Sequence, residues 1–248
     1  MENVNQWIMI LVAIALSLFI SILVALLSGS LQIKRNMRAD APLDEFKAHM
    51  DERIPALMKQ YSIPGCNIAL VQDNEVVWTM GYGYADVASG TPLMVNTPMS
   101  VQSITKSVTA WGVMRLVEKG LIDLDASVSQ YLKSWEFPQS DYPTEKITTR
   151  QLLSHTSGMP LGDFTKIYSP GEAMPSNRDV MTGEAVLMRE PGTGFSYSNT
   201  GYNILEILIE DVTGQNFPEY LRTEVLLPLG MESAAFDIDE EVTPYPPT

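Results

Sequence analysis

The chain has 248 residues, of which 45% are hydrophobic and 19% charged, and its net charge at pH 7 is −14. An acidic chain without a basic stripe is not expected to bind nucleic acid. The single cysteine excludes an internal disulfide framework, and two histidines with one cysteine argue against a zinc site. We therefore expect neither a metal nor a cofactor.

The first element is an apolar segment at the N-terminus. Residues 8–27 run for twenty positions without a charge, the length needed to cross a bilayer. The start lacks Lys and Arg, and a small-residue cleavage site is poor, which favours an uncleaved anchor over a cleaved signal peptide. We assign residues 1–30 to a membrane anchor with one transmembrane helix and residues 31–42 to a linker. A buried core helix is the less favoured alternative, because such helices are rarely apolar all round.

Strand and helix patterns follow in a definite order. Apolar spacing predicts a helix over residues 43–61. Two β-rich runs, residues 66–72 and 75–80, flank Asp73-Asn74 and predict a hairpin. A long helix is predicted from Ser103, closed by Gly120. Further helices are predicted over residues 126–132, 149–154, 203–213 and 217–225. This order indicates an α/β beginning that leads into a helical region.

Ser103 and Lys106 form the first motif with chemical potential. At spacing i, i+3 on a helix they share one face and lie close enough for a hydrogen bond. A serine hydroxyl is a weak nucleophile until a neighbouring base takes its proton, and a partly desolvated lysine is suited to do so. A chain of this composition shows roughly one Ser-x-x-Lys by chance, so the motif alone is weak. Its structural alternative is a solvated lysine one turn from an N-cap serine.

Tyr197 and Asn199 form the second motif. In an extended or looped segment, positions i and i+2 point to the same side, so a phenol and an amide would face one site. The phenol could relay a proton, and the amide could hold Lys106 or a substrate carbonyl. The structural alternative is turn chemistry between Gly194 and Gly201.

The sequence around these motifs resembles the serine β-lactamase and penicillin-binding-protein superfamily, specifically its class C-like branch. The resemblance extends from about Ile63 to about Met231, with the matching segments in the family's order. They include Gly81-Tyr82-Gly83-Tyr84-Ala85-Asp86, Ser103-Ile104-Thr105-Lys106-Ser107, Leu116-Val117-Glu118-Lys119-Gly120, Leu152-Leu153-Ser154-His155-Thr156-Ser157-Gly158 and Tyr197-Ser198-Asn199-Thr200-Gly201-Tyr202.

This resemblance implies an α/β (α+β) fold of the β-lactamase/transpeptidase type, with a partial central antiparallel sheet and a helical domain. Residues 43–236 would form this β-lactamase-like domain, without its C-terminal strands. It implies that the acylated nucleophile is Ser103, its activator Lys106, the general acid/base Tyr197 and a substrate contact Asn199. The implied substrate is a β-lactam, a D-alanyl peptide or an ester, because lactamases, peptidases and esterases share these motifs. It places His155 in a helix-to-loop segment, where we favour a structural role. Gly-x-Ser-x-Gly is absent, which argues against an α/β-hydrolase elbow.

The chain departs from the family pattern after its second motif. No Lys-Thr-Gly or His-x-Gly triplet follows, whereas family members continue with further strands, this third motif and an oxyanion-hole N–H. We therefore expect a C-terminally truncated member that is at best weakly active by itself, since losing one oxyanion donor costs roughly a hundred- to a thousandfold in rate. Residues 237–248 form an acidic and Pro-rich tail.

Three functions stay open: a membrane-anchored serine hydrolase, a non-catalytic penicillin-binding or sensor-like pseudoenzyme, and an inactive gene fragment. Deacylation separates the first two, because an enzyme releases product and a sensor stays labelled. The expected partners are a small-molecule or peptide substrate and the membrane. Lys34, Arg35 and Arg38 follow the span, so the positive-inside rule favours a cytoplasmic domain. The resemblance implies an extracytoplasmic one, which we favour for this single-pass protein.

Overall fold

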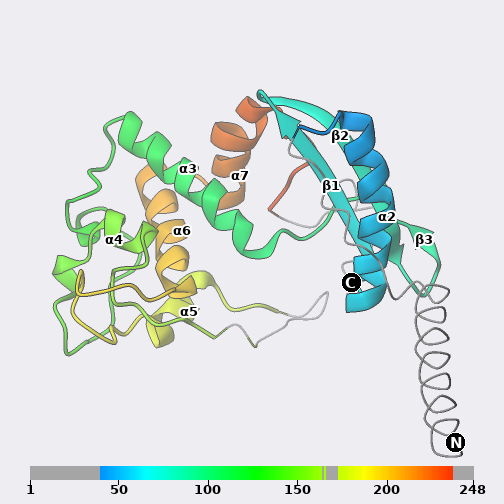
Figure 1. Cartoon of the computed structure of the whole chain (residues 1–248). Coiled ribbons are helices and arrows are strands. Elements are labelled where there is room, and N and C mark those ends of the chain that lie inside the picture. The colour runs from blue at the N-terminus through cyan, green and yellow to red at the C-terminus, as the bar shows by residue number, and fades with distance from the viewer. Residues whose placement is uncertain (1–39, 164, 166–172, 237–248) are drawn as a thin grey trace, which may run out of the picture. The chain divides into compact units, whose positions relative to one another are not determined.

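The computed structural model describes residues 40–163, 165 and 173–236, so the predicted anchor helix at residues 8–27 and the tail at 237–248 lie outside the described residues. The chain divides into two compact units, Met1–Val95 and Asn96–Thr248 (Figure 1). Within the described ranges, no helix is both long enough and apolar enough to cross a membrane.

The described part of the first unit contains α2 (Leu43–Tyr61), which has the predicted bounds. β1 (Gly65–Gln72) and β2 (Glu75–Asp86) follow as an antiparallel pair, and the short β3 (Thr91–Pro92) pairs with the end of β2, giving the strand order β1-β2-β3. At the β1–β2 turn, Asp73 and Asn74 have φ of 51° and 65°. Two positive φ values in a two-residue loop give the turn a twist that matches the strands. The predicted hairpin is therefore confirmed.

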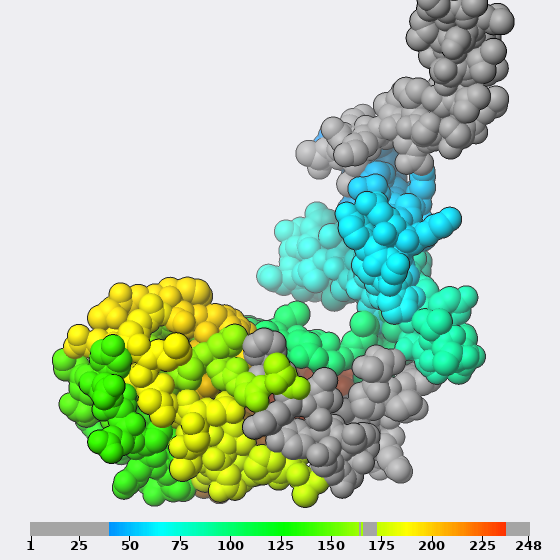
Figure 2. Space-filling model, turned by 90° about the horizontal axis from the view of Figure 1, so that it is seen from below, coloured from blue at the N-terminus to red at the C-terminus, as the bar shows by residue number. Residues whose placement is uncertain are grey.

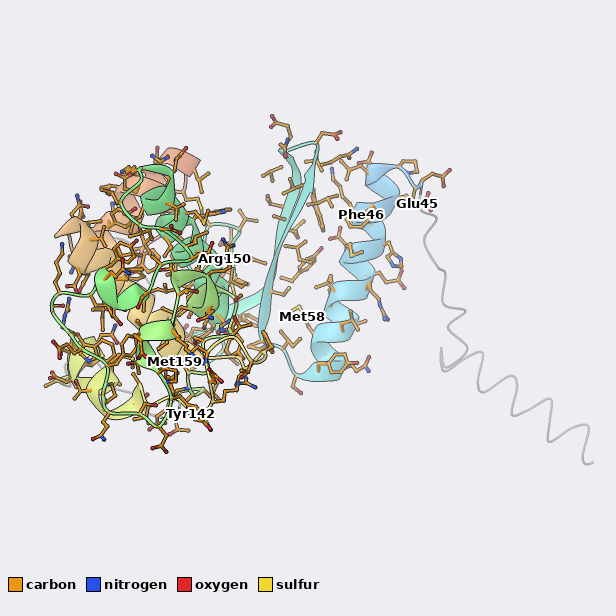
Figure 3. All side chains as sticks on the ribbon, turned by 90° about the vertical axis from the view of Figure 1, so that its left-hand side faces the viewer. Glu45, Phe46, Met58, Tyr142, Arg150 and Met159 are labelled. Carbon is orange, nitrogen blue, oxygen red and sulfur yellow. The ribbon has the colours of Figure 1, made fainter. Side chains whose placement is uncertain are left out.

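Aromatic and close backbone contacts hold α2 against the hairpin. The Phe46 ring meets Trp78 edge-on, with the ring centroids 5.7 Å apart. Gly83 has a φ of +76°, and a Cβ there would lie only 2.7 Å from Cε of Met58, so the glycine permits this close approach. Figure 3 shows Phe46 and Met58 on the side of α2 that faces the hairpin, and Glu45 directed away from it.

α6 (Asn199–Thr213) is the central helix of the second unit. Four shorter or flanking helices contact it: α3 (Thr105–Glu118), α4 (Thr149–Leu153), α5 (Asn177–Glu184) and α7 (Phe217–Leu221). Its apolar face is fully buried through Ile204, Leu205, Ile207, Leu208 and Ile209. Removing these side chains from water is the main stabilising contribution to this unit. In the space-filling view, the green and yellow segments of the unit form one continuous surface (Figure 2).

Close packing between α3 and α7 completes this core. The buried Tyr220 hydroxyl donates a hydrogen bond to the Gly112 carbonyl at 3.0 Å. A Cβ on Gly112 would lie 2.3 Å from Cδ2 of Leu221, so a larger residue would force the two helices apart. The chain then continues from α7 through a π-helical turn, η4 (Arg222–Leu226), and a 3₁₀ turn, η5 (Leu227–Leu229).

The predicted helix over residues 126–132 is wrong. Only a 3₁₀ turn, η2 (Val128–Gln130), forms there. The Val128 N–H donates to the Ile147 carbonyl at 2.8 Å, and Ser127 forms an antiparallel bridge with Thr148. These pairings occupy backbone groups that a helix would use internally, so a distant segment overrides the local helical pattern.

The helices predicted at 149–154, 203–213 and 217–225 are confirmed as α4, as α6 and as α7 with η4. α6 begins four residues earlier than predicted because the Ser198 side chain caps it, accepting a hydrogen bond from the Gly201 N–H at 2.8 Å. This earlier start places Asn199 in the first turn of α6, next to Tyr197.

Candidate active site

Ser103 lies in a 3₁₀ turn, η1 (Gln102–Ile104), immediately before α3. The preceding residue, Gln102, has a φ of 47°, a left-handed conformation that side-chain-bearing residues rarely adopt. Such backbone strain occurs preferentially at functional sites. The turn leaves Ser103 exposed, so its hydroxyl is accessible to a ligand.

Two polar side chains converge on the Ser103 hydroxyl. Lys106 Nζ donates a hydrogen bond to Ser103 Oγ at 3.2 Å, which confirms that the i, i+3 pair shares a helical face. The Tyr197 hydroxyl donates to the same oxygen at 2.9 Å, across 94 positions of the sequence. The structure thus joins the two sequence motifs at one atom.

Ser198 and its neighbours hold Tyr197 in position. Besides capping α6, the Ser198 hydroxyl donates to the Pro160 carbonyl at 2.6 Å. The Asn199 N–H donates to the Leu161 carbonyl at 2.9 Å. The segment is therefore fixed on both sides of Ser198, and Tyr197 is directed from a rigid helix start rather than from a free loop.

The charge of Lys106 sets the electrostatics of the site. Its Nζ lies 4.9 Å from the ring centroid of Tyr197 and 5.5 Å from that of Tyr202, within the range of cation–π attraction. Hydrogen bonds with Lys106 and Ser103 lower the pKa of Tyr197, because they stabilise the phenolate. Burial has the opposite effect on Tyr202, whose pKa is raised. Tyr197 is thus the tyrosine better suited to give up a proton.

His155 supports Tyr197 rather than Ser103. Its ring lies 4.4 Å from the Tyr197 ring, centroid to centroid, and its Nδ1 accepts a hydrogen bond from the Ser198 N–H at 3.1 Å. Burial, together with the charge of Lys106, lowers the pKa of His155, so the ring is held neutral and able to accept this bond. A structural role was expected for His155, and the folded chain adds its contact with the Tyr197 ring.

Asn199 and Glu206 share a hollow with the nucleophile. The hollow has a volume of about 370 Å³, and its walls include Ser103, Lys106 and Asn199. Glu206 also lines it, and burial raises the pKa of this carboxyl to about 6. Glu206 was not predicted from the sequence, although its carboxyl lies between the apolar residues Leu205 and Ile207 of α6, seven positions after Asn199.

This fold and this serine site define the class of β-lactamases and penicillin-binding proteins. The Beta-lactamase family model matches residues 50–247, and the chain belongs to that family. It is 28% identical over 194 residues to penicillin-binding protein 4* of Bacillus subtilis (strain 168), a match that covers 75% of this chain and 40% of that protein. The chain therefore spans less than half the length of this curated relative.

Solved structures give the same assignment. The octameric penicillin-binding protein homologue from Pyrococcus abyssi is 32% identical with a TM-score of 0.63, over 79% of this chain and 45% of that one. A D-amino acid amidase from Ochrobactrum anthropi SV3, solved with L-phenylalanine amide, is 25% identical with a TM-score of 0.63, over 74% of this chain and 51% of that one.

Proposed function

We propose that this chain carries the acylation site of a serine hydrolase that acts through an acyl-enzyme on a β-lactam, a D-alanyl peptide or an ester. The observation that carries the proposal is the double hydrogen bond to Ser103 Oγ, from Lys106 Nζ at 3.2 Å and from the Tyr197 hydroxyl at 2.9 Å. A nucleophile needs such an activating neighbour, and Ser103 has two. The penicillin-binding and amidase names of the relatives are consistent with this substrate range.

The geometry supports the following roles. Tyr197, in the phenolate form that Lys106 favours, takes the Ser103 proton as Oγ attacks the substrate carbonyl carbon. Tyr197 then passes this proton to the leaving group as the scissile bond breaks, which leaves an ester on Ser103. Water attacks this ester with Tyr197 again as base, and Ser103 regains its proton. Asn199, on the wall of the same hollow, contacts the substrate.

Intact-mass measurement of the 248-residue chain tests the proposal directly. The folded chain is exposed to a reporter penicillin and, separately, to a p-nitrophenyl ester, beside its Ser103→Ala variant. The expected result is a mass increase equal to one acyl group that is absent from the variant. Folded protein that gains no mass from either reagent, or gains it equally without Ser103, would overturn the proposal. Loss of the adduct with time distinguishes a hydrolase from a permanently acylated sensor.

We also propose that residues 8–27 anchor the chain in a membrane, with the described units on the extracytoplasmic side. The twenty uncharged positions of this segment support the anchor. Retention of the full chain in a carbonate-washed membrane fraction, with its second unit digested by protease added outside intact cells, is the expected result. Release into the wash would contradict the anchor, and protection from external protease would contradict the orientation.

A further inference from the structure

His155 holds the segment around Tyr197 on both sides of the tyrosine. Its backbone carbonyl accepts a hydrogen bond from the Ser196 N–H at 2.8 Å, and its ring Nδ1 accepts one from the Ser198 N–H at 3.1 Å. The ring itself lies against Tyr197, with the two centroids 4.4 Å apart. A single residue thus contacts the tyrosine ring and binds the backbone of both of its neighbours.

The backbone of His155 is set for these contacts. His155 follows α4, and its N–H donates to the Leu152 carbonyl at 3.3 Å. Its φ is 59°, a left-handed conformation that few residues with a side chain adopt. Strain of this kind persists where the surrounding structure requires it. The strained turn allows both acceptors of His155, the carbonyl and Nδ1, to face the segment that carries Tyr197.

The bond to Ser198 requires an uncharged ring. A neutral imidazole has one donor and one acceptor nitrogen, whereas both nitrogens are donors in the imidazolium. A proton on Nδ1 would therefore face the Ser198 N–H, and Ser198 is only 1% exposed, so water is poorly placed to accept from it instead. Among the described residues, the ionisable groups against the ring are Lys106 of α3, Tyr197 and Tyr202 of α6. The charge of Lys106 opposes a second positive charge there.

We propose that His155 is a positioning residue for Tyr197 and that a proton on its Nδ1 releases the tyrosine from the nucleophile. This proposal rests on the proposed function, because it assigns the transfer of the Ser103 proton to Tyr197. The neutral ring fixes Ser198 and so keeps the Tyr197 hydroxyl 2.9 Å from Ser103 Oγ. Burial and the charge of Lys106 lower the pKa of His155 below its ordinary value of 6.5. The site is therefore held together at neutral pH and is released in acid.

The pH dependence of acylation by a p-nitrophenyl ester tests this proposal on the 248-residue chain. His155→Asn keeps an acceptor oxygen on Cγ, where His carries Nδ1, and tolerates a positive φ, but it takes up no proton. Below pH 6.5, the parent rate should fall more steeply than the titration of Tyr197 alone predicts. His155→Asn should lack this additional fall and stay within about tenfold of the parent rate at pH 7.5. His155→Leu, which has no acceptor, should be about ten- to a hundredfold slower at pH 7.5.

Two control variants separate His155 from other groups that titrate in this range. His49→Asn changes the only other histidine, which lies on α2 in the first unit. Glu206→Gln removes the carboxyl whose pKa is about 6. Both should keep the additional fall, and its loss in either control would overturn the proposal. A His155→Asn variant that retains the fall, or is as slow as His155→Leu, would also overturn it, as would a folded His155→Leu variant with the parent rate.

NMR of the nitrogen-labelled chain separates this proposal from the proposed function. The chemical shifts of the two ring nitrogens of His155 should show, at pH 7.5, a proton on Nε2 and none on Nδ1. The Ser198 amide resonance should shift as the ring takes up its second proton in acid. A proton on Nδ1 at pH 7.5, or a Ser198 amide that does not respond to the titration, would overturn the proposal even where Ser103 is acylated. If no ester acylates Ser103, the proposed function fails, and this titration alone supports or overturns the pH-dependent bond to Ser198.

Discussion

Replacing Glu206 by Gln is expected to stabilise the protein at neutral pH. Gln keeps the size of the side chain and its ability to accept the hydrogen bond from Asn177, but it carries no charge into this half-buried position. The pKa of Glu206 rises from an ordinary value of 4.5 to about 6, mainly through burial. The folded chain therefore binds more protons than the unfolded chain between these values, and its stability falls as the pH rises through this window.

The size of the effect follows from the displaced pKa. The rise in the pKa from 4.5 to about 6 corresponds to a loss of about 2 kcal/mol of unfolding free energy. This loss is complete above pH 6 and absent well below pH 4.5. The sequence pI is 4.5, so measurements at that pH risk precipitation. At pH 5 less than half of this cost remains, whereas at pH 7.5 it is present in full. Glu206→Gln should thus gain about 1 kcal/mol more, relative to the parent chain, at the higher pH.

Urea unfolding followed by circular dichroism at pH 5.0 and 7.5 measures this difference. Glu136→Gln is the control, because that residue is exposed in the same unit. It should change the stability by less than about 0.5 kcal/mol at both pH values. A Glu206→Gln variant that is equally stable at both pH values relative to the parent, or less stable at pH 7.5, would refute the description of Glu206 as a half-buried acid whose charge is poorly balanced.

Three further predictions concern the site and the core. Tyr197→Phe should lower the rate of Ser103 acylation by about a hundred- to ten-thousandfold. In the parent chain this rate should rise with pH as Tyr197 loses its proton, with a pKa below 10, and the variant should lack this rise. Single-turnover kinetics at several pH values measure both effects, and an unchanged pH profile would exclude Tyr197 as the base. Leu208→Ala should cost about 2–5 kcal/mol of unfolding free energy, because Leu208 is fully buried. Leu121→Ala changes a half-exposed site and should cost much less. Equal losses of stability in urea unfolding would contradict the assigned core. Thr148→Ala should cost about 1 kcal/mol of unfolding free energy, because it removes the hydroxyl that accepts a hydrogen bond from the Gln151 N–H at the start of α4. Thr148→Ser keeps this hydroxyl and should be close to neutral. A similar loss of stability in both variants would argue against the cap.

The elements that could be predicted from sequence are those specified by neighbouring residues. Asp73 and Asn74 tolerate positive φ, so their position between two β-rich runs was sufficient to predict the hairpin. The helix pattern over residues 126–132 failed because Val128 bonds to Ile147, nineteen positions away. No local periodicity contains that pairing, and a single sequence does not reveal it.

The same distinction applies to the site. Ser103 and Lys106 lie one helical turn apart, so their contact follows from spacing alone. The meeting of Ser103 with Tyr197 depends on packing between α3 and α6, and only the family resemblance predicted it. Glu206 has no motif around it. Its importance comes from burial beside the nucleophile, which is a property of the folded chain.

The two partners of Ser103 are not equivalent as bases. Lys106 Nζ lies over the rings of Tyr197 and Tyr202, and its hydrogen bond and charge lower the pKa of Tyr197. Tyr197 is also the closer partner, at 2.9 Å against 3.2 Å. The neutral His155 ring packs on Tyr197 without adding a second positive charge. Under the proposed function the lysine acts by its charge and the tyrosine moves the proton, so the protonation of Tyr197 should set the pH at which acylation begins.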